Sequence, residues 1–319
     1  MLAFLVRRLG FGLLVVWLVS LLSWLVFASA LNPLTVFFPN FHSKQALAAV
    51  ARGHLHEPLL VRYWYWLEGL FTGKGFGVSV AYGDPVWQLV GPAFYRTLEL
   101  LGASLLVVLL VSVAIGFVSA RRDGSALDVG LRTFAYVTWS TPAFLLALLV
   151  QHWFVAMDAS WHFQPFSFSG PPAAGGGFVD WLRHMTLPAL AVGFGLAGAY
   201  ARLLRSSLLA TMGMPYVGVA RAKGLPERRV VLRHALRNAL VPFTTLVAFD
   251  FGALVGATLA VDYVFGLQGL ASTFLLRGLT PADPHVLEAE LVLVAALVVA
   301  AGILADVLCA WLDPRLRLD

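Results

Sequence analysis

The sequence contains few charged residues and a single cysteine. Lys, Arg, Asp and Glu make up 12% of its 319 residues, whereas about 25% is usual for a soluble domain. Hydrophobic residues make up 60% of the chain, and its mean hydropathy is +0.82. With Cys309 alone, no disulfide can form within the chain. This composition excludes an ordinary soluble domain and predicts a protein whose solvent is the lipid bilayer.

Motifs for catalysis and nucleotide binding are absent or misplaced. No Walker-type G-x-x-x-x-G-K-[ST] sequence is present, so we expect the chain itself not to hydrolyse nucleotide. The G-x-G-x-x-G pattern in "GFGLAG" (193–198) lies in an apolar stretch, where small residues that let helices approach explain it better, as they explain Gly252 and Gly256. His54 and His56 lack the spacing of a zinc motif, and solvated histidines are the favoured interpretation. We therefore assign no catalytic or metal-binding residues, and predict that the chain is not an enzyme by itself.

Six apolar stretches are candidates to cross a bilayer, which takes about 20 helical residues. They are Leu9 to Leu31, Leu98 to Ala120, Phe134 to Met157, Leu187 to Ala201, Ala239 to Val264 and Val286 to Leu312. The first exceeds the roughly 7–15 apolar residues of a signal peptide, so we interpret it as a retained helix. Arg202 directly follows the short fourth stretch, and its side chain must reach or lie at the interface. The predicted fold class is an all-α integral membrane protein with six transmembrane helices.

The distribution of Lys and Arg predicts the orientation. Fifteen of the 22 lie in segments on the same side as the N-terminus, and cytoplasmic segments are enriched in these residues. Both termini are therefore predicted to be cytoplasmic. The whole chain, 1–319, is predicted to form a single transmembrane domain. A large extracytoplasmic segment (32–97) would follow the first helix, and a cytoplasmic loop (204–238) would join the fourth and fifth helices.

The cytoplasmic loop carries the stretch "YVGVARAKGLPERRVVLRHALRNALVP" (216–242). Gly224 can adopt the left-handed conformation that ends a helix, and Pro226 suits the first turn of the next one. Two short helices joined by a sharp turn are therefore expected, with Arg229, Arg233 and Arg237 as a basic stripe on the second. The small and apolar first helix favours docking to a protein partner, although a loop resting on anionic lipid would use the same charges.

Asp250 lies in the middle of the fifth predicted span. An ionisable residue at that depth is costly and is by default a hypothesis of function. A buried pair with an arginine or an amide of another helix is the structural alternative, and both interpretations remain open. Asp306, nearer the end of the last span, is interpreted as structural.

Several motifs together resemble the permease subunits of ABC importers, in particular the dipeptide, oligopeptide and nickel family, permease B type. They are "ARAKGL" (220–225), "HALRNALVP" (234–242), "VFGLQGL" (264–270), "LDPRLR" (312–317), "LPAL" (187–190), "ARLLRSSLL" (201–209), "STPAF" (140–144) and "FLVRRL" (4–9). The resemblance covers essentially the whole chain. The chain departs from the family pattern at "LNPLT" (31–35), at Gly218 and Val219, where Glu and Ala are general, and at Leu267 and Gln268, where an aromatic residue and a proline are common.

The resemblance implies a type I ABC importer permease fold in the plasma membrane of a prokaryote. The chain would form half of a translocation pore for di- or oligopeptides delivered by an extracytoplasmic binding protein. The other implied partners are a second homologous permease subunit and two cytoplasmic ATPase subunits, which would bind the ATP and Mg²⁺. The lipid bilayer surrounds the chain, and neither nucleic acid nor a cofactor in this chain is expected.

The resemblance also implies residue roles. Residues 217–225 would form the coupling helix that docks on an ATPase subunit, with Val217, Ala220, Arg221, Ala222, Lys223, Gly224 and Leu225 as the coupling residues. The translocation path is expected along the fifth span, at Phe249, Asp250 and Asp262.

Alternative functions remain within and outside this family. Nickel and glutathione importers share the permease pattern, so these cargoes stay open. A secondary transporter would show an inverted repeat or several midplane charges, and a membrane-anchored enzyme would show a catalytic constellation. We find none of these features in the sequence.

Overall fold

The computed structural model describes residues 2–30, 51, 54, 56–73, 75–162, 164–173, 175–280 and 283–312. The "LNPLT" segment (31–35) and all but the first residue of "LDPRLR" (312–317) lie outside the described residues, as does much of the predicted extracytoplasmic segment. The described residues are mainly helical. Their one β-type pairing is an isolated antiparallel bridge between Val78 and Pro85.

The chain divides into two compact units. One comprises Met1–Glu99 and Gly266–Ala300, and the other comprises Leu100–Phe265 and Ala301–Asp319. Two long helices, α5 (Val86–Arg121) and α14 (Pro284–Leu312), contribute residues to both units. Each unit is described by itself.

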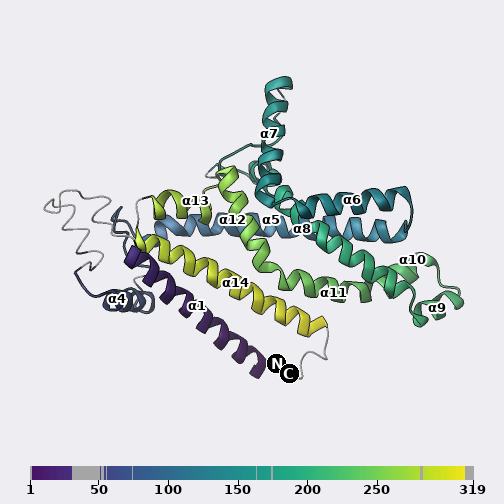
Figure 1. Ribbon diagram of the computed structural model, residues 1–319, viewed down its shortest axis with the longest axis horizontal. Coiled ribbons are helices and arrows are strands. Elements are labelled where there is room, and N and C mark those ends of the chain that lie inside the picture. Colours follow the sequence, from purple (N-terminus) through teal and green to yellow (C-terminus); the bar gives the residue numbers. More distant parts are fainter. Residues whose placement is uncertain are drawn as a thin grey trace. The chain divides into compact units, whose positions relative to one another are not determined.

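The first unit contains α1 (Leu2–Ala30), α4 (Leu59–Phe71), α13 (Leu270–Thr273), the π-helix η2 (Phe274–Leu279) and the first parts of α5 and α14. Helices α1 and α14 run side by side (Figure 1), and Ser23 Oγ donates a hydrogen bond to Glu288 Oε2 at 2.7 Å. Trp24, Tyr63 and Trp66 form a buried aromatic cluster between α1 and α4. Helix α4 therefore attaches to the first unit through its aromatic face.

The second unit is built around α8 (Phe178–Met212). It also contains α6 (Ala126–Ser140), α7 (Ala143–Trp161), α9 (Pro215–Ala222), α10 (Glu227–Arg229), the π-helix η1 (Val230–Ala235), α11 (Leu236–Phe249) and α12 (Phe251–Phe265). Helices α6, α7, α11 and α12 all pack against α8 (Figure 1). The central helix is accordingly the most buried of the candidate spans.

Glycines of α8 permit close helix packing, as the sequence predicts for the "GFGLAG" pattern. A Cβ atom at Gly198 would overlap the carbonyl oxygen of Ala135 on α6, and one at Gly193 would overlap Val107 of α5. The same prediction fails within this chain for Gly256, because no heavy atom lies within 4 Å of its hypothetical Cβ.

The expectation of six spans agrees with the structure. Within the described ranges, five helices are long and apolar enough to cross a bilayer, and a bent pair, Glu227–Phe249 with Phe251–Phe265, makes a sixth if it counts as one span. The fourth span is much longer than the predicted Leu187 to Ala201, because α8 runs from Phe178 to Met212 with Pro188 inside it.

The predicted third span, Phe134 to Met157, is wrong at its N-terminal end. Helix α6 ends at Ser140, and the apolar helix α7 begins at Ala143. Pro142 has no backbone N–H and disfavours the helical conformation of the residue before it. Thr141 accordingly has extended torsion angles, with φ −93° and ψ 123°. Residues 134–140 therefore belong to a separate helix, and the span is Ala143–Trp161.

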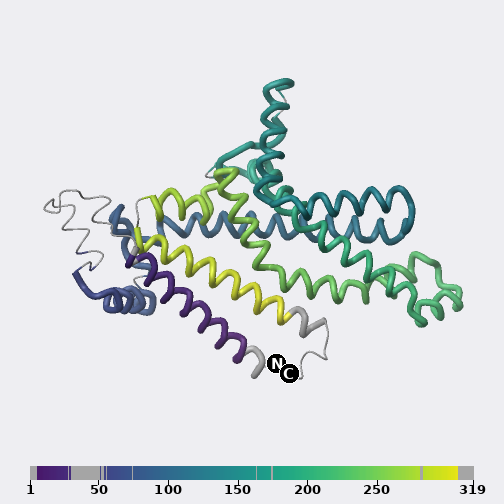
Figure 2. The backbone as a smooth tube through the Cα atoms, in the orientation of Figure 1, coloured from purple at the N-terminus to yellow at the C-terminus, as the bar shows by residue number. Residues whose placement is uncertain are grey.

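The predicted fifth span is interrupted in its middle. Helix α11 ends at Phe249, α12 begins at Phe251, and the two helices are bent by 54° (Figure 2). Asp250 lies at the break with φ −85° and ψ 9°. Asp and the nearby Gly252 both have low helix propensity, which makes this the weak point of the segment.

Candidate functional site

A helix–turn–helix hairpin forms the centre of the predicted cytoplasmic loop. Helix α9 ends at Ala222, and Gly224 follows with φ +76°. The N–H of Gly224 bonds to the carbonyl of Arg221 at 2.9 Å, and that of Leu225 bonds to the carbonyl of Ala220 at 3.4 Å. This pair of bonds is the Schellman arrangement, which favours glycine at the left-handed position. The predicted turn at Gly224 is confirmed.

The helix limits differ slightly from the prediction. Helix α9 begins at Pro215 and ends at Ala222, so Lys223, Gly224 and Leu225 lie in the turn rather than in the predicted helix 217–225. Pro226 is the residue before α10, with φ −61° and ψ 139°, and does not itself occupy the first turn.

Three sets of contacts fix the hairpin. Its interior is a small buried cluster of Val217, Ala220 and Val230, against which Leu225 packs. At one end, Asn238 Nδ2 donates to the Tyr216 hydroxyl at 2.7 Å, and at the other, Arg221 Nη2 pairs with Glu227 Oε1 at 2.7 Å. The hydrogen bonds from Arg221 lower the pKa of the Glu227 carboxyl. These contacts join the two helices of the hairpin.

The predicted coupling residues lie only in part on the outer face of α9, where Ala222 and Lys223 are exposed. Val217 and Ala220 point inward, and Arg221 is engaged by Glu227. The exposed side chains of this helix and its turn are those of Pro215, Tyr216, Val219, Arg221, Ala222 and Lys223, with Gly218 beside them. Gly218 and Val219, the two departures from the family motif, thus lie on the outward face.

The predicted basic stripe lies on the exposed side of the second helix. Arg229, Arg233 and Arg237 are all exposed, whereas Val230, Val231 and Ala235 are buried. Residues 230–235 form a π-helical turn, a type that often occurs at functional sites. The segment from Glu227 to Phe249 is otherwise continuous.

The predicted path residues separate into two places. Phe249 is 76% exposed and Asp250 is half-buried at the break between α11 and α12. The Asp250 carboxylate interacts with the hydroxyl of Tyr200, a buried residue of α8. Asp262 is buried and lies 12 residues further along, roughly 18 Å at the rise of a helix. Asp262 is therefore not part of the break.

A buried carboxylate that the sequence interpretation missed joins three helices. Asp128 of α6 is buried and accepts hydrogen bonds from Arg205 of α8, with Nε at 2.9 Å and Nη2 at 2.8 Å, and from Ser119 of α5. The hydrogen bonds from Arg205 and Ser119 lower the pKa of the Asp128 carboxyl far below its usual range. The sequence carried a signal in Ser125-x-x-Asp128, the pattern of a helix N-terminus. In the structure Ser125 Oγ accepts from the Asp128 N–H at 3.2 Å.

The side chain of Arg202 was expected to reach or lie at the membrane interface. In the structure it also has partners on α6. Its guanidinium lies over the rings of Tyr136 and Trp139, at 4.3 and 4.5 Å from their centroids. Such cation–π contacts lower the cost of a cation next to an apolar span. The charge at the end of the apolar part of α8 is thus held by α6.

Among the described residues, no group of three or more His, Cys, Asp or Glu is arranged to hold a metal ion. His54 lies near the ring of Tyr65, with centroids 4.8 Å apart.

Comparisons with known proteins match the chain along its length. Residues 112–318 match the family described as "Binding-protein-dependent transport system inner membrane component", and residues 1–101 match the N-terminal membrane component of the same systems. The chain is 32% identical to the oligopeptide transport system permease protein OppB of Mycobacterium tuberculosis (strain H37Rv), over 99% of each protein. It is 30% identical to the dipeptide transport system permease protein DppB of Escherichia coli (strain K12), over 82% of each.

Proposed function

Since this chain belongs to the family of inner membrane components of binding-protein-dependent transport systems, we propose that it is the transmembrane subunit of an ATP-driven importer of peptides. The observation that carries this proposal is its similarity to an oligopeptide permease over 99% of both chains. Its apolar helices, together with its family, make it a multi-pass protein of a prokaryotic inner membrane.

The importer would contain four further proteins. We propose a second homologous permease subunit that completes the pore, two cytoplasmic ATPase subunits, and an extracytoplasmic binding protein that delivers the peptide. In this arrangement the ATPase subunits bind ATP and Mg²⁺, and this chain catalyses no hydrolysis and holds no cofactor. Both termini and the 204–238 loop would face the cytoplasm, as the distribution of Lys and Arg favours.

The hairpin of α9 and α10 is suited to receive movement from an ATPase subunit. The buried contacts of Val217, Ala220 and Val230 join its two helices, so the hairpin can move as one body. Its outer face, around Val219 and Lys223, is exposed and free to dock. We propose this face as the coupling surface, with Val217 and Ala220 supporting it from within.

The movement would reach the membrane interior through one helix. Residues Glu227–Phe249 form a continuous helical segment from the hairpin to the break at Asp250, roughly 35 Å long at the rise of an α-helix. Short irregular points between helices absorb changes in backbone angle during such movements. We propose that the break acts as a hinge beside the translocation path, with Phe249 and Asp250 at its edge.

The turn at Gly224 gives a direct test of the coupling surface. A β-branched residue in the left-handed region is strained by about 1–2 kcal/mol, so Gly224→Val is expected to change the end of α9. Asn tolerates this region, so Gly224→Asn is the matched control. We expect wild type and Gly224→Asn to capture the ATPase subunits in a pull-down and to import peptide, and Gly224→Val to lose most of both.

The result that would contradict this assignment is a Gly224→Val protein that captures the ATPase subunits and imports peptide as well as wild type. The hairpin would then not be the docking element. Failure of wild type itself to capture any ATPase, with the second permease present, would favour a loop that rests on lipid.

A further inference from the structure

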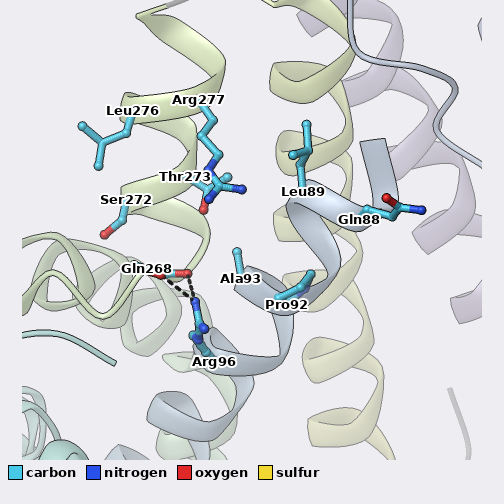
Figure 3. Close-up of a pocket in the computed structure, with 10 residues that line it drawn as sticks. All are labelled: Gln88, Leu89, Pro92, Ala93, Arg96, Gln268, Ser272, Thr273, Leu276 and Arg277. Carbon is cyan, nitrogen blue, oxygen red and sulfur yellow. Dashed lines mark hydrogen bonds between the residues drawn. The ribbon is translucent and has the colours of Figure 1, made fainter. Parts of the chain in front are cut away.

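A groove of 280 Å³ opens between the start of α5 and the α13–η2 segment in the first unit (Figure 3). Two of the residues that line it are arginines and none is acidic. The lining residues are Gln88, Leu89, Pro92, Ala93, Arg96, Gln268, Ser272, Thr273, Leu276 and Arg277. The groove therefore presents positive charge with polar and apolar walls.

One arginine holds the wall of the groove in place. Arg96 Nη1 donates hydrogen bonds to the carbonyl oxygen and to Oε1 of Gln268, at 3.3 and 3.2 Å (Figure 3). Gln268 has φ +57°, which is uncommon for a residue other than glycine. Arg96 thus links α5 to the segment before α13 at one wall of the groove.

The other arginine has no counter-ion among the described residues. Arg277 of η2 is exposed, and its side chain extends into the space between the two helices (Figure 3). A carboxylate near it in sequence, Asp283, is engaged elsewhere, by Ser79 Oγ at 2.5 Å and the Ala81 N–H at 2.9 Å. Glu99 follows Arg96 by one turn of α5 and is not among the lining residues. The Arg277 guanidinium therefore remains available to an anion.

The groove lies beyond the apolar part of α5. This helix has 36 residues, which is roughly 54 Å, whereas the hydrocarbon core is about 30 Å thick. Its long apolar run begins at Leu98, so the turns that carry Gln88 and Arg96 extend out of that core. In the orientation proposed above, they face the side from which cargo arrives.

We propose that this groove binds the C-terminal carboxylate of the peptide cargo. The inference rests on the proposed function and specifies how this chain recognises its substrate. The Arg277 guanidinium pairs with the carboxylate, since its planar fork matches the two oxygens. Thr273 and Gln88 supply further polar groups, and Leu89, Ala93 and Leu276 contact the last side chain of the peptide.

The size of the groove favours a small ligand over a protein surface. Its volume of 280 Å³ is near the lower limit of small-molecule pockets, about 300–1,000 Å³. A docking protein would instead cover a patch of about 800 Å² on each partner. The end of a peptide chain is thus a better match than a segment of the binding protein.

The test compares a peptide with its C-terminal amide. Trialanine and trialanine amide are offered to the complete importer with its binding protein in proteoliposomes, and the ratio of their uptake rates is measured for each variant. The binding protein is the same throughout, so a change in this ratio between variants reports on this chain. Arg277→Gln removes the proposed cation, and Arg183→Gln is the matched control, since Arg183 is an exposed arginine outside the groove.

We expect Arg277→Gln to lower the preference for the free acid about tenfold, the effect of losing one charge-assisted hydrogen bond, and Arg183→Gln to leave it unchanged. An unchanged ratio in Arg277→Gln, with normal peptide uptake by wild type, would overturn the inference and leave the proposed function intact. Equal loss of acid and amide uptake, together with weaker docking of the binding protein, would also overturn it and assign the groove to that protein. Wild type that imports no peptide would refute the proposed function itself.

Discussion

At the scale of single residues, Asp128 connects α5, α6 and α8 through one carboxylate. Removing its charge leaves the partly buried guanidinium of Arg205 without its buried counter-ion, which is costly. Asp123 pairs with the same arginine from the surface, where its side chain is 58% exposed, and such pairs contribute little. We expect Asp128→Asn to lower the melting temperature of the detergent-solubilised protein clearly more than Asp123→Asn does. Equal changes would show that Asp128 does not hold the three helices together.

The stability that Asp128 contributes is expected to depend on pH. Arg205 and Ser119 lower the pKa of Asp128 in the folded protein, so the stability it contributes is present above the ordinary carboxyl pKa, about 3.9. That contribution is lost as the pH falls toward the lowered pKa of the folded state. The difference in melting temperature between wild type and Asp128→Asn should therefore be constant from about pH 5 to pH 8 and should shrink only in more acidic solution.

At the scale of the helices, alanine is expected to change the stability of the protein in opposite directions at two glycines. Alanine at Gly198 would push against the Ala135 carbonyl of α6, and such overpacking typically costs about 1–3 kcal/mol. Alanine at Gly256, an exposed position with no neighbour within 4 Å, should stabilise α12 by up to about 1 kcal/mol through helix propensity. Denaturant unfolding in micelles measures both. A loss at Gly256 as large as at Gly198 would show that another chain packs there in the assembly.

The number of apolar spans could be predicted from the sequence because hydropathy and length are properties of each segment alone. The breaks at Thr141 and Asp250 could not be placed by that criterion, since the segments on both sides are apolar. The local signals are single residues: Pro142 at the first break, and Asp250 with Gly252 close by in sequence at the second. Such residues change the backbone without changing the hydropathy of the segment.

For the hairpin of α9 and α10, local sequence predicts the turn but not which side chains are buried. Its turn was predictable because Gly224 is a local signal for a left-handed backbone. The burial of Val217 and Ala220 was not predictable, because it depends on contacts with Val230 and Leu225, which follow later in the chain. The groove at Arg96 was missed for the same reason, since Gln268 lies 172 residues away in the sequence.

At the scale of the whole molecule, orientation decides whether the hairpin can meet a cytoplasmic ATPase. The excess of Lys and Arg predicts that the 204–238 loop is inside and that Arg183 is outside. With the single native cysteine replaced (Cys309→Ala), Lys223→Cys and Arg183→Cys place one thiol at an exposed position on each predicted side. In intact spheroplasts, a membrane-impermeant maleimide should label Arg183→Cys, and it should label Lys223→Cys only after the membrane is opened. The reverse pattern would put the hairpin and the groove on the wrong sides for an importer, because no cytoplasmic ATPase could reach Lys223 and no incoming peptide could reach Arg277.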